Sequence, residues 1–123
     1  MPDAEYLFVY GTLRRGVKNK FSELLAAKSQ FLDEARLAGR LYDFGEHPGA
    51  VLSADPGDWV RGEVFQLNDP PGILETLDQY EGPEFERVAT SATLSSGREL
   101  TAWVYVYKGT NTGHRVLSGD WLA

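Results

Sequence analysis

Glu81 is a carboxylate at a position that would change its acid–base chemistry. Residues 71–81 carry apolar side chains on one face of a predicted helix, at Ile73, Leu74, Leu77 and Tyr80. At about 100° per residue, Glu81 projects within roughly 40° of Leu77, so it belongs to the buried face. Desolvation and the negative end of the helix dipole would both raise its pKa, which suits a general acid/base near neutral pH. The alternative is a helix-end carboxylate that points into water or caps a loop amide, and position alone leaves both interpretations open.

A second candidate site is the turn that follows the first predicted strand. Residues 6–10 are aromatic, β-branched or Leu and indicate a buried strand. The strand ends at Gly11, which permits close approach to the backbone and leaves N–H groups free in the following loop. This loop could bind an anion or a carbonyl oxygen; alternatively, it is an ordinary glycine turn. Its glycines have the spacing of a phosphate loop, but Val17 stands where that motif needs a lysine.

The other charged side chains near these two sites are predicted to be solvated. On and after the helix they are Glu75, Asp78, Glu84 and Glu86. The loop after the first strand carries a basic cluster of Arg14, Arg15, Lys18 and Lys20. With 18 acidic and 12 basic residues the net charge is −6, which argues against a nucleic acid partner because binding to phosphate backbones needs clustered cations. We interpret the basic cluster as a solvated loop, and a small anionic ligand stays open.

The residue inventory excludes several chemistries. The chain has no cysteine, so disulfides, thiolate nucleophiles and cysteine metal sites are excluded. His47 and His114 lack the spacing of a helical metal site, and no G-x-S-x-G motif is present, so we predict neither a metal nor a cofactor. No apolar run approaches the ~20 residues that span a bilayer. The first residues lack a basic region typical of a signal peptide, and we expect a cytoplasmic protein with no membrane partner.

Length and periodicity predict one domain, at residues 1–123, with more strands than helices. Helices are predicted at residues 21–27 and 71–81. Besides the first strand, alternation of apolar and polar residues predicts strands at 31–42, 59–67, 85–94 and 99–107. The last two form a hairpin, and the strands follow one another as meanders rather than as alternating βαβ units. We therefore predict an α+β fold with a mostly antiparallel, barrel-like sheet.

Turn chemistry and tail composition complete this prediction. Asn68 and Asp69 are candidate caps for the second helix, and Gly82 followed by proline is its predicted end. The segment 50–52 is a brief apolar stretch between two turns. Residues 114–123 include enough apolar surface to dock on the body of the domain.

Two stretches taken together resemble the γ-glutamylcyclotransferase-like superfamily, in its AIG2-like and γ-glutamylamine cyclotransferase branch. They are Phe8-Val9-Tyr10-Gly11-Thr12-Leu13-Arg14-Arg15-Gly16 and Leu77-Asp78-Gln79-Tyr80-Glu81-Gly82. Shorter supporting stretches follow in order along nearly the whole chain, among them Gly39-Arg40-Leu41-Tyr42-Asp43, Val60-Arg61-Gly62-Glu63-Val64-Phe65 and Ala102-Trp103-Val104-Tyr105.

The resemblance implies a small mixed, mostly antiparallel β-barrel with flanking short helices and a cavity that holds a γ-glutamyl group. It places the substrate loop on Tyr10, Gly11, Thr12 and Leu13, and the catalytic carboxylate on Glu81. In the implied cofactor-free reaction, the α-amine of the substrate attacks its own γ-carbonyl. This closes 5-oxoproline and expels an amine or an amino acid, with Glu81 as the proton shuttle.

Other positions bear on which substrate is used. Tyr105 is a candidate for orienting the substrate, with plain core packing as the alternative. His47 and Phe85 stand where the family often carries tyrosine, which affects contacts at the rim of the cavity. The partners expected are a small γ-glutamyl substrate and, at most, a second copy in a weak homodimer, with a monomer equally compatible. The competing hypothesis is a non-catalytic module that binds a small ligand in the same cavity.

Overall fold

The computed structural model describes residues 5–45, 47–55, 57–109 and 113–121. Its seven strands and two helices, in chain order, are β1 (Tyr6–Val9), α1 (Lys20–Ala27), β2 (Ser29–Asp43), β3 (Pro48–Leu52), β4 (Trp59–Leu67), α2 (Pro70–Glu81), β5 (Phe85–Leu94), β6 (Glu99–Tyr107) and β7 (His114–Arg115). The stretch at 50–52 is thus part of a strand, β3, and the segment 114–123 contributes a short strand, β7.

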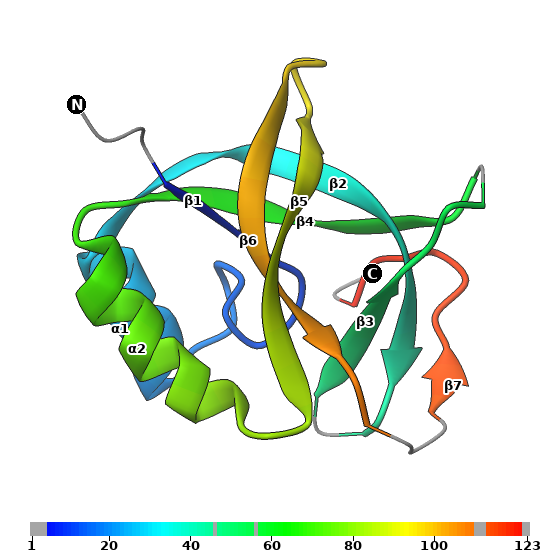
Figure 1. Ribbon diagram of the computed structural model, residues 1–123, viewed down its shortest axis with the longest axis horizontal. Coiled ribbons are helices and arrows are strands. Elements are labelled where there is room, and N and C mark those ends of the chain that lie inside the picture. Colours follow the sequence, from blue (N-terminus) through cyan, green and yellow to red (C-terminus); the bar gives the residue numbers. More distant parts are fainter. Residues whose placement is uncertain (1–4, 46, 56, 110–112, 122–123) are drawn as a thin grey trace.

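Five of the strands close a small barrel (Figure 1). Around it the order is β2, β4, β1, β6 and β5, and the pairing of β5 with β2 closes the ring. Only β1 with β6 is a parallel pair; the other neighbours are antiparallel. β3 and β7 extend the sheet from β2. The predicted α+β fold with a small, mostly antiparallel barrel and two flanking helices is confirmed.

The apolar core has two parts that meet at β1. Inside the barrel, Phe8 and Tyr10 pack with side chains from the other strands. On the outer face, Leu7 and Val9 pack against the two helices, which lie together on one side of the barrel (Figure 1). β1 is buried on both faces because its alternating side chains serve both clusters. The continuous apolar run at residues 6–10 was the sequence signal for this placement.

A β-bulge shifts the alternation at the start of β2. Phe31 pairs with Phe65 of β4, and Asp33 pairs with Val64, so one extra residue of β2 is inserted between them. Beyond the bulge, Ala35, Leu37 and Leu41 point into the barrel as predicted. Phe31 was expected on that same face but is 38% exposed, because the inserted residue moves it to the outside.

Helix α2 begins one residue earlier than predicted and is not capped as expected. The Asp69 side chain makes no hydrogen bond to the first turn, although its carbonyl oxygen accepts from Ile73 N at 3.1 Å. Pro70 and Pro71 have no N–H to be capped, which removes two of the free donors at this helix start. At the other end, Gly82 has a φ of 82°, a conformation that glycine adopts without strain. The predicted stop after Glu81 is confirmed.

The segment after β6 docks only in part. Val116 and Trp121 pack against the interior cluster, whereas Leu117 is 85% exposed. Neither helix in the described part of the chain has both the length and the apolar character that crossing a bilayer requires.

Candidate functional site

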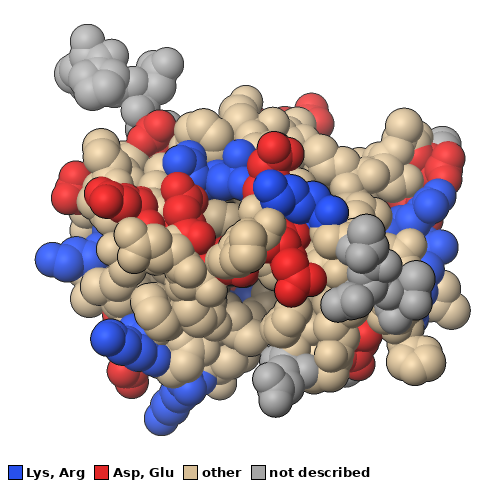
Figure 2. All heavy atoms as spheres, turned by 60° about the horizontal axis from the view of Figure 1, so that its bottom comes forward, with Lys and Arg blue, Asp and Glu red and all other residues tan. Residues whose placement is uncertain are grey.

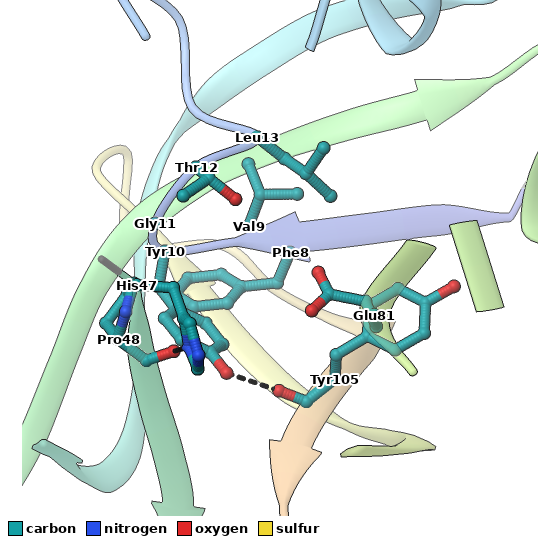
Figure 3. A pocket seen from close by; sticks show the side chains of 10 residues that line it. All are labelled: Phe8, Val9, Tyr10, Gly11, Thr12, Leu13, His47, Pro48, Glu81 and Tyr105. Carbon is teal, nitrogen blue, oxygen red and sulfur yellow. Dashed lines mark hydrogen bonds between the residues drawn. The ribbon is translucent and has the colours of Figure 1, made fainter. Parts of the chain in front are cut away.

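The end of β1 and the end of α2 meet at a pocket. Ten residues line it, and Figure 3 shows their side chains: Phe8, Val9, Tyr10, Gly11, Thr12, Leu13, His47, Pro48, Glu81 and Tyr105. All six residues singled out from the sequence are therefore together in one pocket. The closed barrel brings them there, because the end of β1 lies between β4 and β6 while α2 packs across the outer face of the same strands.

Glu81 lies at the last position of α2, and its side chain extends into the pocket beside Tyr105 (Figure 3). The apolar stripe predicted for the helix is buried, at Ile73, Leu74 and Leu77. Glu81 follows this stripe and is itself half-buried. Within the described residues nothing donates a hydrogen bond to its carboxylate. Burial raises the pKa of Glu81 to about 7, because loss of water disfavours the charged form.

The turn after β1 is held by hydrogen bonds within the loop and by packing against β3. Arg14 N donates to Gly11 O at 3.0 Å, and Asn19 Nδ2 donates to Thr12 O at 2.8 Å. Pro48 of β3 lies against Gly11, where an added Cβ would stand 2.8 Å from Pro48 Cδ. Among the described residues, none accepts a hydrogen bond from the N–H groups of Gly11, Thr12 and Leu13. All three residues line the pocket, so an anion or a carbonyl oxygen bound there is the candidate acceptor for these N–H groups.

The Tyr10 hydroxyl is occupied inside the protein. It donates to Tyr105 O at 2.6 Å and accepts from Ala50 N at 3.2 Å, so it joins β6 and β3 across the pocket floor. Burial, reinforced by the charge of Glu81, raises the pKa of this phenol and keeps it protonated. Tyr10 therefore contributes its ring to the pocket, and its proton is committed to a backbone carbonyl.

Tyr105 belongs to a network that the sequence did not reveal. Its hydroxyl donates to Asp78 Oδ1 at 2.7 Å, and Arg87 donates to the same carboxylate from Nε at 2.8 Å. Asp78 was predicted to be a solvated charge, and it is exposed as predicted; the sequence did not predict its hydrogen bonds to Arg87 and Tyr105. Burial alone would raise its pKa, but the hydrogen bonds from Arg87 and Tyr105 outweigh burial and lower it. The network ties α2 to β5 and β6 one helical turn before Glu81. In the sequence, the three-residue spacing of Asp78 and Glu81 indicates that their side chains are neighbours on the helix surface, which could have drawn attention to Asp78.

A second hollow adjoins the first and shares Thr12, His47 and Glu81 with it. Its remaining lining residues are Tyr80 and Phe85. We call this outer hollow the vestibule. The two positions that depart from the family pattern, His47 and Phe85, both line the vestibule. The described residues contain no group of three His, Cys, Asp or Glu side chains placed to share a metal ion.

The basic cluster after β1 is not uniformly solvated. Arg14 is buried: Nη1 donates to Asp120 Oδ1 at 2.7 Å, and Nε lies 3.7 Å from Glu63 Oε2. Glu63 of β4 is buried too and accepts from Arg15 N at 2.8 Å. The interpretation of the whole cluster as a solvated loop is therefore wrong for Arg14. Its charge is compensated by two carboxylates that are distant in sequence but adjacent in the structure. Figure 2 shows that Lys and Arg are interspersed with Asp and Glu on the face it presents.

Comparison with known proteins gives matches over almost the whole chain. Residues 7–123 match the family model described as "Gamma-glutamyl cyclotransferase, AIG2-like". A Vibrio cholerae protein named "Putative gamma-glutamylcyclotransferase" is 36% identical over 120 residues, which cover 94% of this chain and 93% of the relative. The "Gamma-L-glutamyl-butirosin B gamma-glutamyl cyclotransferase" of Niallia circulans is 35% identical over 112 residues, covering 82% of this chain and 65% of the relative.

A solved structure shares the fold. The crystal structure of YkqA from Bacillus subtilis is similar with a TM-score of 0.76 and 28% sequence identity, over 97% of this chain and 40% of that longer one. The barrel and its two helices are thus an architecture that related chains also adopt.

Proposed function

The chain belongs to the gamma-glutamyl cyclotransferase, AIG2-like family, and from that premise we propose that it is an enzyme that releases 5-oxoproline from a γ-glutamylamine or a small γ-glutamyl peptide. The observation that carries the proposal is Glu81, a half-buried carboxylate with a pKa of about 7 in the same pocket as the free N–H groups of the loop after β1. The names of the relatives favour this enzyme over a non-catalytic binding module.

The proposed reaction is an intramolecular acyl transfer. The α-nitrogen of the γ-glutamyl group attacks the γ-carbonyl carbon, so a carbon–nitrogen bond forms and closes a five-membered lactam. The bond from that carbon to the leaving nitrogen breaks. Protons released by the α-ammonium pass to the leaving nitrogen, and the products are 5-oxoproline and a free amine. No water is consumed, and no oxidant or reductant is needed.

Glu81 is the proposed proton carrier. As a carboxylate it takes a proton from the α-ammonium, which frees the lone pair for attack; as an acid it returns a proton to the departing nitrogen. A pKa of about 7 suits both halves of this cycle, because each protonation state is accessible near neutral pH. Its lack of a hydrogen-bond partner among the described residues leaves both oxygens available to the substrate.

The loop after β1 is the proposed binding element. The N–H groups of Gly11, Thr12 and Leu13 would hold the substrate carboxylate or the oxyanion that develops on the γ-carbonyl. Tyr105 is proposed as a positioning residue, since its hydroxyl is held by Asp78 and its ring lies beside Glu81.

The test is release of 5-oxoproline, followed by mass spectrometry, from a panel of γ-glutamyl amines and dipeptides. We expect wild type to release it and Glu81→Gln to lose about 10²- to 10⁴-fold in rate, the usual contribution of a general acid/base. Glu86→Gln is the matched control, because Glu86 is exposed at the start of β5. Unchanged turnover in Glu81→Gln would remove Glu81 from the mechanism. If wild type releases no 5-oxoproline from any compound of the panel but binds one of them saturably, the result would favour the binding module.

A further inference from the structure

The vestibule has one aromatic wall that is fixed on the helix side. Tyr80 of α2 stacks on Phe21 of α1 with ring centroids 4.2 Å apart. Its hydroxyl shares a hydrogen bond of 2.8 Å with Thr12 Oγ1. Stacking and hydrogen bond together hold the Tyr80 ring in place beside the loop after β1, so this wall is formed before any ligand enters.

The opposite wall is aromatic as well. The rings of His47 and Phe85 meet edge to face at 5.9 Å. Phe85 also contacts Tyr107 at 5.6 Å, and Tyr107 contacts Phe44 at 4.5 Å, so the wall continues into a cluster of rings. These side chains come from β5, β6 and the segment that joins β2 to β3. Two aromatic walls thus face the space outside Glu81.

The described residues that line the vestibule supply no permanent positive charge. Among the described residues that line it, none is Lys or Arg, and Glu81 itself is acidic. The nearby arginine, Arg87, is paired with Asp78 and lies over the Trp103 ring. Lys20 lies over the Phe21 ring at 5.9 Å and is not part of the lining. A carboxylate held here would meet a second carboxylate without a compensating cation, which disfavours binding.

We propose that the vestibule is the leaving-group site and that it selects γ-glutamylamines whose leaving amine carries an aromatic ring and no carboxylate. The inference rests on the proposed function. Glu81 borders both hollows, so a γ-carbonyl beside it would have the glutamyl group in the inner pocket and the leaving nitrogen facing the vestibule. Leaving groups that are amino acids or peptides carry a carboxylate into that space, whereas a simple arylalkylamine brings only a ring.

Two matched substrates test the charge part of this proposal. γ-Glutamyl-phenethylamine and γ-glutamyl-phenylalanine differ only by the carboxylate of the leaving group. We expect kcat/KM for 5-oxoproline release to favour the phenethylamine derivative by roughly tenfold or more, a discrimination within the reach of one pocket contact. γ-Glutamyl-ethylamine, which lacks the ring, should also fall below the phenethylamine derivative. Equal or better turnover of the phenylalanine derivative would overturn the proposal.

Substitutions that add a cation to the vestibule supply the second test. Phe85→Arg should raise kcat/KM for the phenylalanine derivative relative to the phenethylamine derivative. His47→Lys should do the same from an exposed position, which guards against misfolding of the first variant. Leu117→Arg is the control: it adds the same charge at an exposed site that does not line the vestibule. A control that shifts the ratio as strongly as Phe85→Arg would show that net charge, and not the vestibule, sets the preference.

Binding to the Glu81→Gln variant separates failure of this inference from failure of the proposed function. Calorimetry on that variant measures affinity for the two ring-bearing compounds without turnover. If wild type releases no 5-oxoproline from any compound, the proposed function fails. A tighter dissociation constant for the phenethylamine derivative would still support a vestibule that disfavours a carboxylate on the leaving group. Equal affinities in this variant would overturn the vestibule proposal even if wild type is an active cyclotransferase.

Discussion

Glu81 is a carboxylate that the fold partly buries without giving it a cationic or hydrogen-bonding partner among the described residues. Two exposed carboxylates at this end of the molecule have cationic or hydroxyl partners: Asp78 has Arg87 and Tyr105, and Glu84 accepts from the Tyr107 hydroxyl at 3.2 Å. Glu81 has none within the described residues, and burial raises its pKa to about 7. A site built this way gives up stability in exchange for an acid that titrates near neutral pH.

The first prediction at the scale of the residue concerns stability against pH. The pKa of Glu81 rises from its usual 4.5 to about 7 on folding, so the unfolded chain ionises first as pH increases. The folded state therefore loses stability between pH 4.5 and 7, and the full loss persists above pH 7. Glu81→Gln removes this penalty and should stabilise the protein by about 3 kcal/mol at pH 8, with no gain below pH 4.5.

Urea unfolding of both proteins across this pH range measures the difference. Glu86→Gln should show no comparable change in free energy of unfolding between pH 4.5 and 8, because Glu86 is exposed. A Glu81→Gln variant that is no more stable than wild type at pH 8 would show that burial does not penalise this carboxylate.

The second prediction concerns the pH dependence of turnover. If Glu81 must be ionised to accept the proton, kcat/KM should fall about tenfold per pH unit below its pKa of about 7. The residual activity of Glu81→Gln should lack this acid limb. A profile that stays flat from pH 7 to pH 5 would assign the proton transfer to another group.

At the scale of elements, the site depends on how closely β3 approaches the end of β1. Pro48 occupies the space where Gly11 would carry a Cβ, so the loop after β1 can turn only because residue 11 is glycine. The same approach brings Ala50 N to the Tyr10 hydroxyl. Strand β3 thus shapes the pocket although it lies outside the barrel ring.

We predict that Gly11→Ala destabilises the protein by about 1–3 kcal/mol through overpacking against Pro48 and lowers 5-oxoproline release. The double variant Gly11→Ala/Pro48→Ala should recover part of both losses, since the smaller side chain makes room for the added methyl group. Chemical denaturation of wild type, both single variants and the double variant gives the coupling energy. A coupling energy near zero would mean that the two residues do not compete for this space.

At the scale of the whole molecule, Arg14 joins segments that are distant in sequence. It links the loop after β1 to Glu63 of β4 and to Asp120 near the end of the chain. These contacts fasten the far side of the substrate loop to the barrel. Loop, barrel and C-terminal segment are therefore expected to unfold together.

Arg14→Met should cost about 3 kcal/mol, because it leaves the buried Glu63 carboxylate with only Arg15 as a partner. Arg61→Gln is the control: Arg61 is exposed, and its replacement should change the free energy of unfolding by no more than about 0.5 kcal/mol. Equilibrium unfolding in urea compares the two. If both substitutions change the free energy of unfolding by similar small amounts, the ion pairs of Arg14 do not stabilise the fold.

Local sequence determined most of the helices and strands, and it determined the part of the site that α2 contributes, Glu81. The turn chemistry around the hairpin gave β5 and β6 at their observed bounds, and the apolar stripe on α2 placed Glu81 on the buried face. These features depend on residues near in sequence, through periodicity and glycine turns. The family resemblance added the assignment of the loop after β1 as the substrate loop and of Glu81 as the catalytic carboxylate.

Tertiary structure alone decided which side chains that are distant in sequence come into contact. The bulge in β2 that turns Phe31 outward, the pairing of Asp78 with Tyr105 and the burial of Arg14 between Glu63 and Asp120 all involve long-range pairing. The partners of Asp78 and the burial of Arg14 depend on what the closed barrel places beside these two polar residues. A one-dimensional pattern reports the face on which a side chain lies, whereas its pKa and its partners follow from the strands that close over it.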